Sequence, residues 1–182
     1  RRAALHRLKQ LAENKWTSET YGIAGRIYKG QAQAEHKAGN SKAADGALQL
    51  AIETYEDGFR FDPRDYYPGI NAVTLRLRRG TAEDLRELAT LAPVVRFSVN
   101  RAPAPEHEME RYWQEATKLE LACAEGDWEG AHKLLSGLLA IPAEDWMRET
   151  TVKNLKTQQH TFSDDSSAVT ALDEIIGELT PR

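Results

Sequence analysis

The chain has 182 residues, of which 41% are hydrophobic and 29% charged, a composition typical of one globular domain with a substantial core. No apolar run approaches the roughly 18–20 residues that a membrane-spanning helix needs, and a formal net charge of −4 with mixed signs disfavours a nucleic-acid-binding surface. Cys123 is the only cysteine, which excludes an intramolecular disulfide, and no Cys/His spacing suits zinc.

The chain begins Arg1-Arg2-Ala3-Ala4, without an initiator Met or the apolar stretch of a signal peptide. We therefore expect it to be a piece of a longer protein. The single cysteine and the lack of an Asn-x-Ser/Thr acceptor indicate a cytoplasmic location.

Apolar residues recur at spacings of three and four, which predicts helices along most of the chain. Leu5, Leu8, Leu11 and Ala12 predict a short first helix, and Thr17 or Ser18 caps a second. The next helices are predicted over residues 42–61, ended by Asp62-Pro63, over 66–79, ended by Gly80, and over 81–100, begun by the capping box Thr81-x-x-Asp84.

The proline-rich loop Ala102-Pro103-Ala104-Pro105 interrupts the chain, and further helices are predicted over residues 108–125, 127–140 and 143–161. After a polar break, the last helix carries an apolar stripe of Val169, Leu172, Ile175, Ile176 and Leu179. These patterns give about nine helices and no strand. We expect a single all-α domain over residues 1–182, with a core over 18–160 and a capping helix within 163–182.

The spacing of small and aromatic residues matches a tetratricopeptide repeat, in which small residues let paired helices approach closely. Gly25-x2-Tyr28 is followed by Ala51-x3-Tyr55-x2-Gly58-x4-Pro63. The distance from Gly25 to Ala51 is too long for the repeat, which predicts an insertion at Gln31–Lys42. Gly80 and Gly126-Asp127-Trp128 mark later turns. We expect a tetratricopeptide-like α-α superhelix, with an irregular helical bundle as the alternative.

Two segments resemble the TRAFs-binding domain, the central regulatory region of the apoptosis signal-regulating kinases and of related bacterial proteins. They are Gly25-Arg26-Ile27-Tyr28-Lys29, and Phe59-x-x-Asp62-Pro63 leading into Gly69-Ile70-Asn71-Ala72-Val73. The resemblance covers roughly residues 18–160 and implies a helical scaffold in signalling that docks partner proteins or neighbouring domains of its own chain. Thr54-Tyr55 departs from the Trp-Phe pair of the kinases, and the composition is closer to a bacterial relative.

No catalytic motif emerges from the sequence. The histidines are scattered at His6, His36, His107, His132 and His160, and Cys123 lies among apolar neighbours. The adjacent carboxylates Glu56-Asp57 and Glu144-Asp145 point apart on a helix, and no phosphate-binding glycine loop occurs. We therefore expect no enzyme, cofactor or metal. The alternative is an all-α enzyme whose site is assembled from distant residues.

Partner binding is expected on the first helix of each pair, which lines the concave face of stacked helical repeats. The candidate residues there are Arg26, Lys29, Asn71, Thr74, Arg78, Trp113 and Glu120. Cations beside an amide suit an acidic peptide or a terminal carboxylate.

Each candidate also has a structural interpretation. Arg26 and Lys29 could pair with Glu53 or Asp57, and Asn71 could bond a buried carbonyl. Trp113, like Tyr112, Trp128 and Trp146, could belong to the core. The basic cluster Arg76, Arg78 and Arg79 is interpreted as a solvated helix end.

Overall fold

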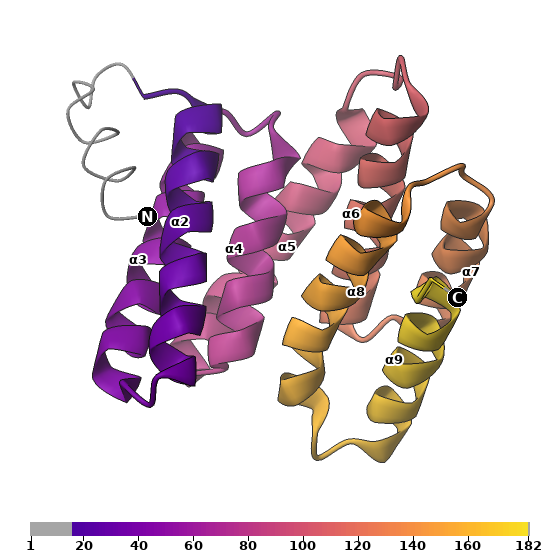
Figure 1. Cartoon of the computed structure of the whole chain (residues 1–182). Helices are drawn as coiled ribbons and strands as arrows, with labels where there is room; N and C mark the ends of the chain where they lie inside the picture. The colour runs from indigo at the N-terminus through magenta and orange to yellow at the C-terminus, as the bar shows by residue number, and fades with distance from the viewer. Residues whose placement is uncertain (1–15, 182) are drawn as a thin grey trace. The chain divides into compact units, whose positions relative to one another are not determined.

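The computed structural model describes residues 16–181 and is helical throughout that range, without a strand (Figure 1). The eight α-helices in these residues, joined by one short 3-10 helix, are α2 (Ser18–Lys37), α3 (Ser41–Phe61), α4 (Tyr66–Arg79), α5 (Ala82–Arg101), α6 (Glu108–Glu125), α7 (Trp128–Leu139), α8 (Asp145–Gln159), η2 (His160–Phe162) and α9 (Ser166–Leu179). The predicted all-α class is confirmed. The short helix predicted around Leu5–Ala12 lies outside the described residues.

Local signals account for most helix boundaries. The Thr81 hydroxyl accepts from the Asp84 amide while the Asp84 carboxylate accepts from the Thr81 amide, so the predicted capping box begins α5. Gly80 and Gly126 end α4 and α6 with φ of 65° and 73°, a left-handed conformation that glycine adopts without a steric cost. The predicted helix over 143–161 is shorter, because α8 ends at Gln159 and continues as η2.

The predicted insertion at Gln31–Lys42 lengthens a helical hairpin. It covers the last turns of α2, the connecting turn and the start of α3, so the two helices reach 20 and 21 residues. Their packing follows the repeat pattern, because a Cβ on Gly25 would lie 2.8 Å from the ring of the fully buried Tyr55. Gly25 is therefore required for the close contact that its spacing predicted.

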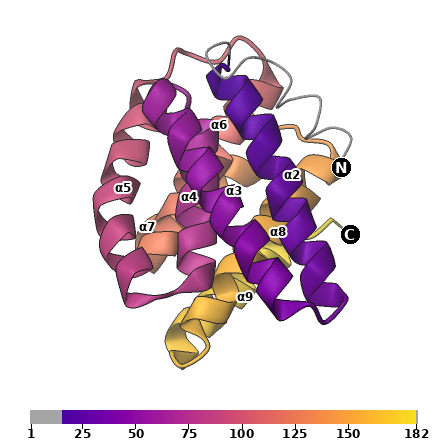
Figure 2. The ribbon, with the colours of Figure 1, turned by 90° about the vertical axis from the view of Figure 1, so that its left-hand side faces the viewer.

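The first of two compact units, described over residues 16–75, contains α2 running parallel to α4. Ser18 hydrogen-bonds Asp65 at the start of both helices, and Lys29 reaches Asn71 further along. Contacts in the same order along both helices require them to point the same way, as Figure 2 also shows for this unit. First helices of successive repeats pack in this manner.

The second unit, described over residues 76–181, repeats this arrangement with α6 and α8. Tyr112 bonds Thr151 through their hydroxyls at 3.0 Å, and the Gln158 amide donates to the Glu120 carbonyl at 3.2 Å. The order again makes the two helices parallel. Helices α7 and α9 pack beside them around one apolar core, whose fully buried side chains include Leu119, Leu135, Leu155, Leu172 and Ile175.

The turn between α4 and α5 corrects one expectation. Arg76 and Arg79 were predicted to lie on a solvated helix end, but both bind the fully buried Asp84 carboxylate. Arg76 Nη1 lies 3.0 Å from Asp84 Oδ1, and Arg79 Nε lies 2.7 Å from Asp84 Oδ2. The sequence reading was wrong because capping of α5 buries Asp84 and turns the two guanidinium groups toward it.

Candidate partner-binding surfaces

Lys29 and Asn71 come together on the parallel helices α2 and α4. Lys29 Nζ donates to Asn71 Oδ1 at 3.1 Å, and Asn71 Nδ2 donates to the carbonyl oxygen of Tyr67 at 3.0 Å. Asn71 is only 8% exposed, whereas Lys29 is half-buried. The amide is held by its own helix and accepts a hydrogen bond from the Lys29 ammonium group, so Asn71 links α4 to α2.

Arg26 lies one turn before Lys29 on α2, and its side chain is exposed. Gln49 bonds Glu53 and Arg60 bonds Asp57, and the pairing of Arg26 or Lys29 with either acid stays a prediction. The first unit thus presents two adjacent cations, Arg26 and Lys29, on one helix. We refer to Arg26, Lys29 and Asn71 as the basic seam.

The other two candidates on α4 lie differently. Thr74 is 1% exposed, and its hydroxyl has no hydrogen-bond partner among the residues that the structure describes. Its position suits packing better than contact with a partner. Arg78 is half-buried in the last turn of α4, between the two arginines that bind Asp84.

Trp113 and Glu120 lie on α6 in the second unit and have separate environments. Glu120 is 4% exposed and accepts a hydrogen bond from Asn154 Nδ2 at 3.0 Å, which joins α6 to α8. Trp113 packs partly against the core and has its ring centroid 5.8 Å from that of Trp146. Glu120 therefore has a packing role in the helix seam, while Trp113 belongs to a cluster that reaches the surface.

Trp146 is another residue whose predicted burial is wrong. It was interpreted as core, yet its side chain is 47% exposed in the first turn of α8. Met109, in the first turn of α6, is also exposed, at 48%. The sequence signal for their exposure is that both lie at helix starts among acidic residues. Aromatic side chains in such polar surroundings are often surface contacts.

The single cysteine is a packing residue. Cys123 is fully buried in the apolar core of the second unit, and burial together with the nearby Glu120 carboxylate raises the pKa of its thiol to about 12. A thiol with that pKa holds almost no thiolate near neutral pH, and the thiolate is the nucleophile.

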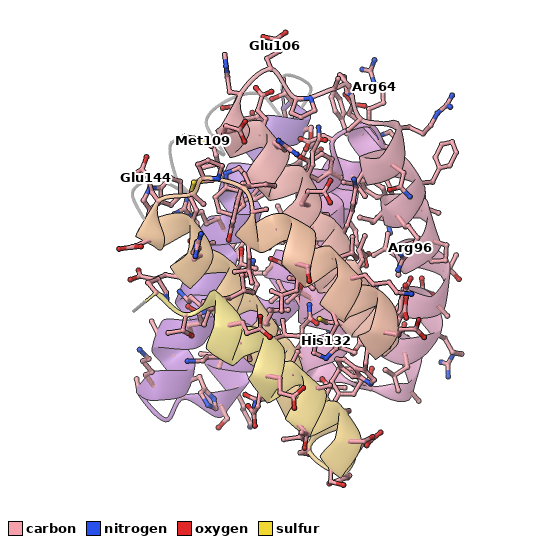
Figure 3. The ribbon with its side chains drawn as sticks, turned by 90° about the vertical axis from the view of Figure 1, so that its right-hand side faces the viewer. Arg64, Arg96, Glu106, Met109, His132 and Glu144 are labelled. Carbon is pink, nitrogen blue, oxygen red and sulfur yellow. The ribbon has the colours of Figure 1, made fainter. Side chains whose placement is uncertain are left out.

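The histidines that the structure describes with side chains, His36, His107 and His132, come from different elements. His132 on α7 lies 3.8 Å from Glu174 on α9 and is labelled in Figure 3. His6 lies outside the described residues. Across residues 16–181, with the side chain of His160 left aside, no group of three His, Cys, Asp or Glu has the arrangement of a metal site.

Comparison with known proteins locates the repeat resemblance in the first part of the chain. Residues 1–76 match the family described as Tetratricopeptide Repeats-Sensor. No curated protein and no solved structure matches the chain. Within the described range, no helix is long and apolar enough to span a bilayer. The match falls in the first unit, where the Gly25 and Ala51 spacing predicted a repeat of this class.

Proposed function

We propose that this chain is a protein-interaction module that regulates other domains or proteins by docking an acidic segment on the basic seam. The observation that carries the proposal is the Lys29–Asn71 contact between parallel α2 and α4, with the exposed Arg26 one turn away. Two cations one turn apart on α2, beside the Asn71 amide of α4, can donate several charge-assisted hydrogen bonds to carboxylates. Tetratricopeptide-like domains generally bind proteins or peptides.

The regulatory part of the proposal has two supports. The matched family carries the word sensor in its description, and the Gly25–Lys29 and Gly69–Val73 segments resemble the TRAFs-binding domain of signalling kinases. A scaffold of this type would dock a partner protein or a neighbouring domain of a longer chain. The partner segment is expected to be extended or helical and rich in Asp and Glu, or to end in a free carboxylate.

A binding role fits the shifted ionisable groups better than a catalytic role does. Burial in the core raises the pKa of Cys123 to about 12, and burial also raises the pKa of Tyr55 above its usual range. Asp84 has a lowered pKa, but it is enclosed by arginines that hold a helix turn. Each group is explained by packing or by an ion pair, and catalytic groups are usually perturbed where a substrate can reach them.

The test uses a fluorescein-labelled Asp/Glu-rich peptide that ends in a free carboxylate, titrated with the full chain by fluorescence anisotropy. We expect saturable binding, and we expect the double substitution Arg26→Gln and Lys29→Gln to weaken it about tenfold because two charge-assisted contacts are lost. Lys42→Gln, an exposed cation in the first turn of α3, is the matched control and should bind as the unaltered chain does. Equal weakening by both variants would show non-specific attraction and reject the seam.

A further inference from the structure

A second surface lies at the start of α6 and α8, entirely within the second unit. It consists of Met109, Trp113 and Trp146, which we call the aromatic surface. Met109 and Trp146 are 48% and 47% exposed, and Trp113 lies one turn after Met109, against Trp146. Apolar side chains gathered at one exposed place commonly mark an interaction site.

The two indole rings are held in position. Trp113 meets the ring of the fully buried Tyr112 edge-on at 5.2 Å, and it packs against the core of the unit. Trp146 Nε1 donates to Glu144 Oε2 at 2.8 Å. Ordered aromatic faces lose little conformational entropy when a partner covers them, which is one reason that Trp is enriched at binding hot spots.

The two segments that carry the aromatic surface are rich in acidic residues. Residues 106–115 and 143–150 hold seven carboxylates and two arginines, a formal charge of −5, whereas the rest of the chain sums to +1 because the total is −4. Figure 3 labels Glu106, Met109 and Glu144, which come from the loop before α6, the first turn of α6 and the residue before α8. The excess negative charge of the chain thus lies in the two segments that carry these aromatic rings, and Lys118, just beyond the first segment, pairs with Glu115.

Helix capping explains only part of this pattern. Carboxylates in the first turn of a helix are stabilised by the helix dipole, which accounts for Glu108, Glu110 and Asp145. It does not account for Glu149, which lies beyond the first turn of α8 and is exposed. Nor does it account for the exposure of Met109 and Trp146, because capping needs no apolar side chain there.

We propose that the aromatic surface docks a basic amphipathic segment of a partner protein. Its Lys or Arg side chains would lie over the Trp113 and Trp146 rings, with their charges among the surrounding carboxylates. Its apolar residues would cover Met109. The proposal goes beyond the basic seam, because it assigns a different surface, on the other unit, to a partner of opposite charge.

The test probe is a fluorescein-labelled amphipathic helical peptide of about 15 residues built from Lys, Leu and Ala. Binding to the full chain is measured by anisotropy at low and moderate salt. We expect Trp146→Ala to weaken binding about tenfold and the pair Glu144→Gln and Glu149→Gln to weaken it about fivefold, with affinity falling as salt rises.

Phe97→Ala is the matched control, since Phe97 on α5 is an aromatic side chain that is 67% exposed and has Arg101 over its ring. It should leave the affinity unchanged, and circular dichroism should show that every variant keeps its helices. Glu144 and Glu149 have exposed side chains, so the Glu144→Gln and Glu149→Gln pair tests the proposal even if Trp146→Ala unfolds the chain.

Three results would overturn the proposal: no binding of the basic peptide, equal weakening by Phe97→Ala, or equal binding of a peptide in which Glu replaces every Lys. A fourth would be a fall in the light-scattering mass of the chain on Trp146→Ala, which would assign the surface to contact between copies. Binding of the acidic peptide by the Trp146→Ala variant is measured in parallel. If this variant still binds the acidic peptide, a failure of the aromatic-surface proposal is distinct from a failure of the basic-seam proposal.

Discussion

At the scale of single residues, Asp84 organises the turn between α4 and α5. Its buried carboxylate accepts hydrogen bonds from Arg76, Arg79 and Thr81. Burial alone would raise the pKa of Asp84, but the hydrogen bonds from Arg79 and Thr81 outweigh it and lower the pKa to about 2. The ionised form is therefore the one that stabilises the fold.

Asp84→Asn should lower the free energy of unfolding in a pH-dependent way. The pKa in the folded state lies below the value of about 3.9 for an unfolded chain, so the stabilisation is present above pH of about 4 and is lost as the pH falls through about 2. We expect a loss of about 2 kcal/mol near neutral pH and much less in strong acid. Urea unfolding, followed by circular dichroism near neutral pH and in strong acid, measures this change in the free energy of unfolding.

Glu87→Gln, which removes an exposed carboxylate from the same helix, is the control and should change little. A loss from Asp84→Asn that stayed constant down to the lowest pH would assign the effect to packing and contradict the role of ionisation.

At the scale of elements, helix contacts depend on a few small residues. Gly25 on α2 faces the Tyr55 ring on α3, whereas Gly46 on α3 faces open space. Both glycines lie inside helices, where alanine has the higher helix propensity by about 1 kcal/mol. Their different surroundings separate the effect of propensity from the effect of packing.

Gly25→Ala should destabilise the chain by about 1–3 kcal/mol, because the added Cβ would lie 2.8 Å from the buried ring and must displace it. Gly46→Ala should be neutral or stabilise by up to about 1 kcal/mol. Thermal and urea unfolding of both variants provide the comparison. If both glycines gave the same change, the α2–α3 contact would not depend on Gly25.

At the scale of the whole molecule, charge is divided between the two units. Residues 1–75 carry eleven Lys and Arg against nine Asp and Glu, a net charge of +2, and residues 76–182 carry thirteen against nineteen, a net charge of −6. The basic seam lies in the first unit and the aromatic surface in the second. The net charge of each unit is opposite in sign to that of the partner proposed for its surface.

The two surfaces should bind independently. Arg26→Gln with Lys29→Gln should leave binding of the basic peptide unchanged within about twofold, and Trp146→Ala should do the same for the acidic peptide, because the two surfaces share no residue and sites without shared partners give additive effects. Anisotropy titrations of each variant with each peptide check this. Loss of both activities in either variant would indicate that the surfaces are coupled or that the fold has changed.

Partner binding at the basic seam stays a prediction, although the sequence predicted which helices carry its residues. Periodicity placed Arg26, Lys29 and Asn71 on first helices, and the structure brings Lys29 and Asn71 into contact. The same reasoning gave no means to tell the buried Glu120 from the exposed Trp146. Helical periodicity identifies the faces of one helix, but burial depends on which other helices cover them.

By itself the sequence determined where most of the described helices begin and end, because caps, glycine stops and apolar periodicity act over a few neighbouring residues. It also determined the close α2–α3 contact through the spacing of Gly25 and Tyr55. Only the tertiary structure decided that the buried Asp84 forms ion pairs with two arginines and that Trp146 faces solvent. These outcomes depend on how whole helices and turns pack, since a side chain's exposure and pKa are set by the groups that packing brings to it.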